Sequence, residues 1–350
     1  MIRIGSIGLG GISSGVHIPG IRKSKDLELV ALCDINEERL KERAAQYGIP
    51  LDHCFTDYKD LIDCPDVDAV DISTPNNVHG EIAEYAAKAG KPYDLEKPIT
   101  LNKEEVKSLY DVTKDASVKS MICFSYRYKA SARYARSLIK SGRLGRIYHV
   151  NMQYYQAWGL EHKDAALVWR FVKDIAGSGS LGDLGCHALD LCEFVTGEEY
   201  DKVFAHNGTF VHERRLLEGE GKGKVDVDDY SNIFVETKSG ASFSFEISRF
   251  NYGRGNYQRM EIYGEKGAIV YHLDRIPGVD EIEICDETTG DKYVPLEIPE
   301  EFKVDQMQSF ADIVNGCEDG LSATIEDGLR SQILLDAILE AAEKGTWVKL

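Results

Sequence analysis

Three side chains of this 350-residue chain are of the types needed to move a proton at an alcohol: Lys97, Asp183 and His187. When a hydride leaves a secondary alcohol carbon, the hydroxyl proton must leave as well. A histidine with a pKa near neutrality can accept that proton, and an ammonium group can stabilise negative charge on the oxygen. We therefore interpret His187 as the general base and Lys97 as its electrostatic partner. Burial beside a positive group would lower the pKa of Lys97, so the reverse assignment stays open.

Lys97 belongs to the sequence Glu96-Lys97-Pro98, which follows a short segment at 91–95 that can form a strand and precedes an amphipathic run from Asn102. This context predicts that Lys97 follows a buried parallel strand, at the sheet edge where open α/β folds bind ligands. Pro98 restricts Lys97 to an extended conformation, so the lysine side chain is aimed. A solvated loop lysine is the alternative interpretation.

Asp183 and His187 lie where the glycine-rich segment 177–185 leads into an apolar run, which predicts a buried helix. Residues four apart on a helix project from one face. A carboxylate and an imidazole on an apolar helix need polar partners. They are therefore either a structural pair that satisfies itself or part of a site, in which Asp183 would orient the substrate or tune His187. Asp190 could instead fix the tautomer of the imidazole.

The amino-terminal residues predict a dinucleotide-binding loop. A strand at 2–7 runs into the sequence GLGGIS at 8–13 and then into a helix. Gly8 allows a tight turn, and Gly10 lets the backbone approach a pyrophosphate held at the helix amino terminus. The third glycine position of this motif holds Ser13, which is still small enough for close packing.

Asp34 ends the second expected strand, 27–33, about 20 residues after the glycine loop. A carboxylate there accepts the ribose hydroxyls and repels a 2′-phosphate, so NAD is the expected cofactor. Arg39, one helical turn later, leaves an opening for NADP. Asp34 could also serve as a helix cap.

A third strand, 67–73, ends in Thr74-Pro75-Asn76, which we expect to line the nicotinamide side of the cofactor. His79 opens the next helix, where a lone histidine is more often a capping or packing residue than a catalyst. The complete set of expected NAD contacts is Gly8, Gly10, Gly11, Ile12, Asp34, Ile35, Thr74, Pro75, Asn76, His79, Glu96 and Lys97.

The order of the elements predicts an α/β protein with two domains. Strand–helix alternation over residues 1–124 predicts a doubly wound parallel sheet that binds NAD. Residues 125–350 predict an α/β domain for substrate binding and oligomerisation, with a large, mostly antiparallel, open sheet. Its expected strands are 146–157, 201–211, 228–237, 241–250, 257–263 and 268–272. The charged, glycine-rich stretch 213–229 predicts a mobile loop, and helices at 304–315 and 325–344 end the chain, the last able to pack back on the first domain.

Composition restricts the possible partners. With 41 Lys and Arg against 59 Asp and Glu, the formal charge is -18, which disfavours nucleic acid and anionic membranes. The chain contains no apolar stretch of the ~20 residues that span a bilayer, and we expect a cytoplasmic protein. The eight cysteines are scattered without a CxxC pair, which fits a reducing compartment. We expect no metal, because the candidate residues lack a zinc ligand set.

Several motifs, in the same order along the chain, resemble those of the Gfo/Idh/MocA family, which includes glucose-fructose oxidoreductase and inositol dehydrogenase. They are GLGGIS at 8–13, Asp34, STPN at 73–76, EKP at 96–98, SGRLGRI at 141–147 and GSGSLGDLGCHALDL at 177–191. The resemblance implies a Rossmann domain, a second α/β domain whose open sheet makes homo-oligomer contacts, and a Lys-Asp-His site matching Lys97, Asp183 and His187. Ser13 and Asp94 depart from the family pattern, since Asp94 puts a charge in a strand that is usually apolar.

The family oxidises or reduces hydroxyls of sugars, cyclitols and glycosides. Aromatic rings offer flat apolar faces to a pyranose and arginines offer donors, so we expect a substrate site formed by Arg127, Tyr155, Trp158, Trp169, Arg170 and Asp183, and Tyr154 suits the same ring. The leading hypothesis is an NAD-dependent dehydrogenase of a ring hydroxyl in a sugar, glycoside (such as C3 of a glucoside) or cyclitol. The alternatives are a glycosidase that works by transient oxidation with NAD, an inositol 2-dehydrogenase, and a non-catalytic sensor of NAD or sugar.

Overall fold

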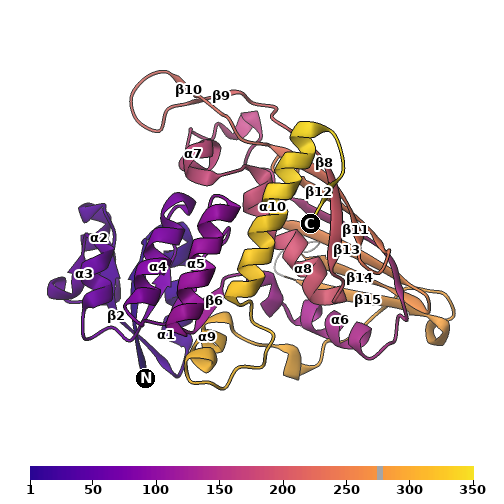
Figure 1. The fold of residues 1–350 in the computed structure, drawn as a ribbon, viewed down its shortest axis with the longest axis horizontal. Helices are drawn as coiled ribbons and strands as arrows, with labels where there is room; N and C mark the ends of the chain where they lie inside the picture. Colours follow the sequence, from indigo (N-terminus) through magenta and orange to yellow (C-terminus); the bar gives the residue numbers. More distant parts are fainter. Residues whose placement is uncertain (274–278) are drawn as a thin grey trace. The chain divides into compact units, whose positions relative to one another are not determined.

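The chain folds into two compact units, each with its own sheet. The computed structural model describes residues 1–273 and 279–350. The first unit combines residues 1–124 with 304–332, and the second combines residues 125–303 with 333–350 (Figure 1). A segment from late in the chain therefore completes the unit that begins it.

The first unit contains a six-stranded parallel sheet in the order β3-β2-β1-β4-β5-β6. Its strands are β1 (Ile2–Ile7), β2 (Leu27–Cys33), β3 (Cys54–Phe55), β4 (Ala69–Ile72), β5 (Tyr93–Leu95) and β6 (Ser120–Ile122). The strand order reverses between β1 and β4, so the loops after their carboxyl ends flank the point where such sheets bind ligands. This order confirms the predicted doubly wound parallel sheet.

The helices of this unit begin and end where local signals place them. They are α1 (Ile18–Lys23), α2 (Glu37–Tyr47), α3 (Tyr58–Asp63), α4 (His79–Lys88), α5 (Lys103–Ala116) and α9 (Gln306–Val314). The side chains of Asn36 and Asn102 cap α2 and α5 by accepting backbone N–H groups of the first turn. The helix after the glycine loop begins as a π-helical turn, η1 (Ser13–His17), before α1.

The late segment is built into the core of the first unit. Helix α9 packs so closely on α1 that a Cβ at Gly20 would lie 2.8 Å from Cγ of Met307. The Ser24 hydroxyl donates to the side-chain carbonyl of Gln308 at 2.8 Å. Ala323 pairs with Ile122 in an isolated antiparallel bridge at the end of β6.

The second unit contains a nine-stranded sheet in the order β16-β15-β14-β13-β7-β12-β11-β8-β17. Its strands are β7 (Ile147–Tyr155), β8 (Tyr200–Gly208), β11 (Tyr230–Thr237), β12 (Ser242–Ser248), β13 (Tyr257–Gly264), β14 (Gly267–Leu273), β15 (Asp280–Asp286), β16 (Val294–Pro295) and β17 (Val348–Lys349). Among these strands only β7 and β12 pair in parallel. The predicted mostly antiparallel sheet is confirmed, while β15, β16 and β17 were not predicted.

Helices cover one face of this sheet (Figure 1). Helix α6 (Ala130–Lys140) packs on α8 (Cys186–Thr196), and α8 packs on β7. Strand β12 alternates between faces, with Phe243, Phe245 and Ile247 buried and Glu246 exposed. The last helix, α10 (Ile325–Lys344), contributes residues to both units.

The predicted mobile loop at 213–229 is wrong. Strands β9 (Glu213–Arg215) and β10 (Lys222–Lys224) pair antiparallel to form a hairpin. Arg214 fixes it, because its buried guanidinium lies 4.1 Å from the ring centre of Phe171 and donates to the carbonyl of Gly159 at 2.6 Å. The hairpin is therefore ordered although its sequence is rich in charges and glycines, because the side chain of Arg214 points inward and is buried.

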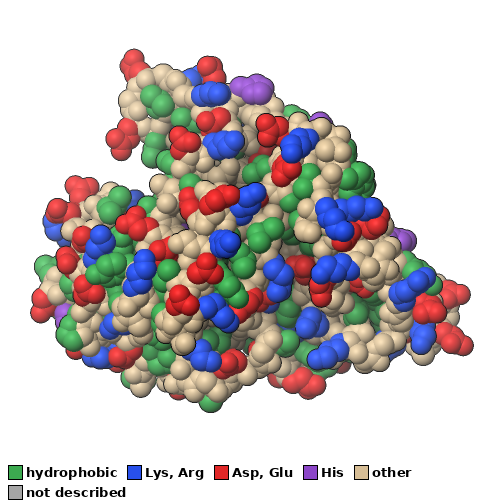
Figure 2. All heavy atoms as spheres, in the orientation of Figure 1, with side chains coloured by type: hydrophobic (Ala, Val, Ile, Leu, Met, Phe, Trp, Pro, Cys, Tyr) green, Lys and Arg blue, Asp and Glu red, His purple; other side chains and the backbone are tan. Residues whose placement is uncertain are grey.

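Charged side chains of both signs are interspersed over the face drawn in Figure 2. Exposed pairs such as Lys88–Glu84 and Lys114–Glu326 are typical, and because water screens both charges each pair contributes little to stability. Among residues 1–273 and 279–350, no helix has the length and hydrophobicity required to cross a bilayer.

Candidate active site

The glycine loop after β1 has the shape of a phosphate cradle. Gly8 has φ of +87°, and a Cβ there would lie 2.8 Å from the carbonyl oxygen of Ser73, so only glycine fits. A Cβ on Gly10 or Gly11 would meet no atom within 4 Å. The outer side of the loop is therefore open, and its backbone can be approached by a ligand.

Asp34 is fixed at the end of β2. Its carboxylate accepts the backbone N–H of Leu9 at 2.9 Å and that of Asn36 at 2.8 Å, and Arg39 donates to it at 3.1 Å. Asn36, not Asp34, caps helix α2. Asp34 is thus available for the role of ribose acceptor, next to Ile35, which is 90% exposed.

The turn after β4 offers a buried donor. The hydroxyl of Thr74 is buried and has no hydrogen-bond partner within the described part of the chain. A buried hydroxyl without a partner is costly, so a ligand that pairs with it gains affinity. His79 lies with its ring nitrogens 2.9 Å from the Thr74 carbonyl and 2.8 Å from the Pro98 carbonyl. This histidine therefore ties the turn after β4 to the turn that carries Lys97.

Lys97 follows β5 directly, as predicted. The backbone N–H of Glu96 donates to Ile72 of β4 at 2.9 Å, which extends the sheet pairing up to Lys97. The N–H of Lys97 donates to the carboxylate of Glu96 at 3.2 Å, and the peptide bond to Pro98 is cis. Lys97 is partly exposed. Its backbone is therefore held by the sheet while its side chain can reach a ligand.

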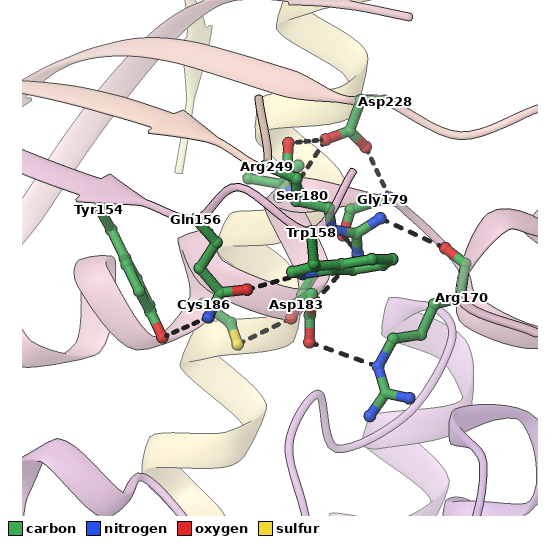
Figure 3. A network of polar contacts seen from close by, with 12 residues as sticks. Tyr154, Gln156, Trp158, Arg170, Gly179, Ser180, Asp183, Cys186, Asp228 and Arg249 are labelled. Atoms are coloured by element: carbon green, nitrogen blue, oxygen red, sulfur yellow. Dashed lines mark hydrogen bonds and ion pairs between the residues drawn. The ribbon is translucent and has the colours of Figure 1, made fainter. Parts of the chain in front are cut away.

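In the second unit, Asp183 lies between two guanidinium groups (Figure 3). Arg249, which follows β12 and is buried, donates to Asp183 at 3.3 Å and to the carbonyl of Gly179 at 2.7 Å. Nε of Arg170 lies 3.7 Å from the other carboxylate oxygen of Asp183. The guanidinium of Arg249 also stacks 4.7 Å from the ring centre of Trp158. Sequence reasoning missed Arg249, because a single arginine after an apolar strand carries no spacing signal.

A close backbone contact explains why the segment 177–185, which leads into α8, is rich in glycine. A Cβ on Gly179 would lie 1.8 Å from the carbonyl oxygen of Asp228, so glycine is required. The Asp228 carboxylate accepts N–H groups of Gly179 and Leu181 and the hydroxyl of Ser180, at 2.6 to 2.8 Å. It therefore anchors the segment that carries Asp183.

His187 is buried near the start of α8, in the predicted buried helix. Residues Leu181–Gly185 form a π-helical turn, η7, so α-helical spacing does not by itself put Asp183 and His187 one above the other. The imidazole of His187 meets the ring of Tyr126 edge-on at 4.8 Å. The Tyr126 hydroxyl is 2.6 Å from that of Tyr154. Asp190 accepts two hydrogen bonds from Arg127, at 2.9 and 2.6 Å.

The aromatic candidates divide between the two faces of the sheet. Tyr154 is buried on the helix-covered face, whereas Tyr155 projects from the opposite face, where it bonds to Glu246 and stacks on Tyr257. The structure therefore places the two neighbouring tyrosines on opposite faces of the sheet, since successive strand residues alternate faces. Trp158 is joined to the Asp183 network by Arg249, and Trp169 stacks 4.2 Å below the Arg170 guanidinium.

Comparison with protein families accounts for both halves of the chain. Residues 2–124 match the oxidoreductase family with an NAD-binding Rossmann fold, and residues 132–270 match the GFO/IDH/MocA C-terminal domain. The chain belongs to the GFO/IDH/MocA family. The predicted family, enzyme class and NAD cofactor are therefore confirmed.

Named members of the GFO/IDH/MocA family resemble this chain over nearly its whole length. Levoglucosan dehydrogenase of Pseudarthrobacter phenanthrenivorans is 34% identical, over 91% of this chain and 88% of that protein. Myo-inositol 2-dehydrogenase of Thermotoga maritima is 28% identical, over 100% of this chain and 98% of that protein. A solved levoglucosan dehydrogenase in complex with NADH has a TM-score of 0.88 at 32% identity and covers 99% of this chain and 98% of that one.

The residues of this GFO/IDH/MocA member fit NAD. The open glycine loop can hold the pyrophosphate, Asp34 the ribose, and the buried Thr74 hydroxyl a polar group of the nicotinamide end. When bound, NAD accepts a hydride and thereby becomes NADH.

Replacing Asp34 with alanine is expected to raise the KM for NAD by about 10-fold and to allow turnover with NADP. The variant loses the ribose acceptor and releases Arg39, which can then meet the 2′-phosphate. Initial rates with each cofactor measure the change. Adding Arg39→Ala should abolish the gain with NADP, and an unchanged preference in Asp34→Ala would contradict the assignment.

Proposed function

We propose that this family member oxidises a secondary ring hydroxyl of a sugar, glycoside or cyclitol, with Lys97, Asp183 and His187 as its catalytic residues. The observation that best supports this is the carboxylate of Asp183, held by Arg249 beside the indole of Trp158 (Figure 3). A carboxylate held in place accepts a hydrogen bond from a sugar hydroxyl, and an indole packs on the C–H face of a pyranose.

The proposed roles follow the charges that move. Bound NAD would supply the hydride acceptor, and the hydroxyl proton goes to His187 as the hydride leaves the same carbon. The ammonium of Lys97 stabilises the negative charge that develops on the oxygen. Asp183 orients the substrate through a neighbouring hydroxyl. Arg127 and Arg170 are proposed as further substrate contacts, together with Trp158 and Trp169.

The substrate class is proposed from chemistry and from the relatives. Levoglucosan, a glucose locked as an internal glycoside, and myo-inositol both present secondary ring hydroxyls flanked by further hydroxyls. We therefore favour a glycoside or other pyranoside, oxidised at a ring carbon such as C3, with an inositol as the next candidate.

Incubation with NAD and a panel of alcohols tests the function. The panel contains levoglucosan, glucose, methyl glucoside, an aryl glucoside and myo-inositol. The expected result is NADH absorbance together with a product two hydrogens lighter than its substrate, whose oxidised carbon is then read by NMR. Cleavage of the aryl glucoside without net NADH would indicate transient oxidation instead. NADH binding with no turnover of any alcohol would favour a sensor.

Arg249→Met is expected to lower kcat/KM for the sugar by roughly 10-fold or more, while NADH affinity stays unchanged, because Asp183 loses its buried partner. Steady-state kinetics and NADH fluorescence titration measure the two effects. Arg215→Met is the matched control, since this arginine of the same unit is 52% exposed and pairs with Asp164 on the surface. A value of kcat/KM close to that of wild type in Arg249→Met would contradict the role of the network.

We also propose that copies of the chain associate through the face of the nine-stranded sheet opposite α6 and α8, in the cytoplasm. Aromatic residues are exposed there or at its edge, with Phe234 51% and Trp347 48% exposed. Light scattering of wild type and Phe234→Lys tests the association, and a wild-type monomer would refute it.

The proposed compartment rests on the cysteines. The eight cysteines, all in described segments, are free thiols, as in a reducing compartment.

A further inference from the structure

A row of polar side chains crosses the interior of the first unit's sheet. Ser6 of β1 is in register with Asp71 of β4, which is in register with Asp94 of β5. All three are fully buried, at 0% exposure. Buried carboxylates are costly unless they are paired, so the fold must supply a partner. The same row accounts for the charge of Asp94, which departs from the family pattern, because Asp94 lies beside Asp71 on the neighbouring strand.

The partner is His17, from the π-helical turn after the glycine loop. Its Nδ1 lies 2.5 Å from Asp71 and 3.7 Å from Asp94, and its Nε2 lies 3.0 Å from Glu96. Ser6 donates to the second oxygen of Asp71 at 2.6 Å. The imidazole is thus held on both sides by carboxylates, with only 1% of its surface exposed.

Where Asp71 and Glu96 are both ionised, this geometry favours a charged imidazole, because only the protonated ring can donate from both nitrogens. Burial lowers the pKa of His17, but Asp71 and Glu96 more than offset this and raise it well above its usual value. Burial and the neighbouring Asp71 raise the pKa of Asp94 well above its usual value. The titratable groups facing His17 are therefore the carboxyl groups of Asp71, Glu96 and Asp94 and the thiol of Cys123, whose pKa burial also raises.

A metal ion is the alternative occupant. Ligand atoms of His17, Asp71 and Asp94 lie within 4.8 Å of one another, as do those of His17, Glu96 and Cys123. Both ring nitrogens, however, lie at hydrogen-bond distance from carboxylates, and an imidazole that is protonated on both nitrogens has no lone pair for a metal. We interpret the imidazolium as the cation that the carboxylates surround.

We propose that His17 is a positioning residue, which fixes the turn carrying Lys97 by holding the carboxylate of Glu96. One oxygen of Glu96 accepts from His17, and the other accepts the backbone N–H of Lys97 at 3.2 Å. The same carboxylate therefore links the helix of the glycine loop to the proposed catalytic lysine. This inference rests on the proposed role of Lys97.

A double-mutant cycle tests the link. His17→Gln should lower kcat about 10-fold or more in the wild-type background and less than about 2-fold in Lys97→Ala, because a residue that acts through Lys97 has no effect without it. The assay uses NAD and the best-oxidised alcohol of levoglucosan, glucose, methyl glucoside and myo-inositol. If His17→Gln does not fold, Glu96→Gln enters the same cycle, since it removes the charge and keeps the shape.

Tyr93→Phe is the matched control for lost stability. Tyr93 precedes Asp94 on β5, faces the opposite side, and is fully buried with its hydroxyl 2.7 Å from that of Thr113. This variant should lower Tm and leave kcat unchanged. A merely structural His17 would behave like Tyr93, with a lower Tm and an unchanged kcat.

The outcomes separate the two proposals. Equal losses of kcat from His17→Gln in both backgrounds, or no loss, would overturn the positioning role and leave the role of Lys97 intact. A Lys97→Ala variant as active as wild type would instead refute the proposed function and, with it, the positioning role. A stoichiometric metal ion in the purified protein, detected by elemental analysis, would overturn the interpretation of the cluster.

Discussion

Replacing Lys97 with alanine is expected to lower kcat by on the order of 100-fold or more, while the affinity for NADH changes by less than about threefold. The expected loss is this large because the ammonium stabilises charge that develops only in the transition state. The pyrophosphate and ribose contacts of the glycine loop and Asp34 do not involve it. Lys88→Ala is the control, because this lysine of the same unit is 61% exposed.

His187→Ala is expected to cause a loss of the same size, because the alcohol then has no base in place. Its dependence on pH separates the two roles. If His187 is the base, Lys97→Ala keeps the acid limb of the pH–rate profile and His187→Ala loses it. The reverse pattern would assign the base to Lys97, and activity close to wild type in either variant would refute the role of that residue.

Replacing Asp94 with asparagine is expected to stabilise the protein, by an amount that grows with pH. The native pKa of Asp94 is raised by burial and by Asp71, so the native state keeps a proton that the unfolded chain loses near pH 4. Between that pH and the native pKa, each pH unit costs the wild type about 1.4 kcal/mol of unfolding free energy. Asparagine retains a donor for Asp71 and an acceptor for Cys123 but never ionises.

Calorimetric unfolding of wild type and Asp94→Asn at pH 5, 7 and 9 measures this difference. The gain should be small at pH 5 and largest at pH 9. His17 also has a raised pKa, so its contribution is complete below about pH 6.5 and is lost as pH rises through the native value. Asp94→Asn keeps His17, so its free energy of unfolding still falls with rising pH, but less steeply than that of the wild type. A gain independent of pH, like that of the exposed control Asp115→Asn, would contradict the protonated state.

Features encoded in short stretches of sequence were predictable. The glycine loop, Asp34, and the turns that carry Thr74 and Lys97 each follow a buried strand, and parallel strands bring their carboxyl ends to one edge. The two sheets followed from the alternation of residue types. The roles of Lys97, Asp183 and His187 stay predictions that the proposed variants test.

Features that depend on contacts distant in sequence were not predictable. The His17 cluster joins residues 17, 71, 94, 96 and 123, and each alone looks like an ordinary polar residue. Arg249 reaches Asp183 across 66 residues. Which of Tyr154 and Tyr155 lies on the helix-covered face could not be predicted either, because a shift of one residue along a strand reverses the face. The composition of residues 213–229 predicted a mobile loop, but contacts of Arg214 with Gly159 and Phe171, which are distant in sequence, order a hairpin there.

The first unit is built from two separate parts of the chain, and this affects how it folds during synthesis. Residues 304–332 supply α9 and the bridge between Ala323 and Ile122, so the nascent chain lacks these contacts until almost all of it has been synthesised. Domains usually fold as they emerge, amino-terminal domain first. The six-stranded sheet therefore cannot gain its last contacts before residues 304–332 have emerged, although its six strands all precede residue 125.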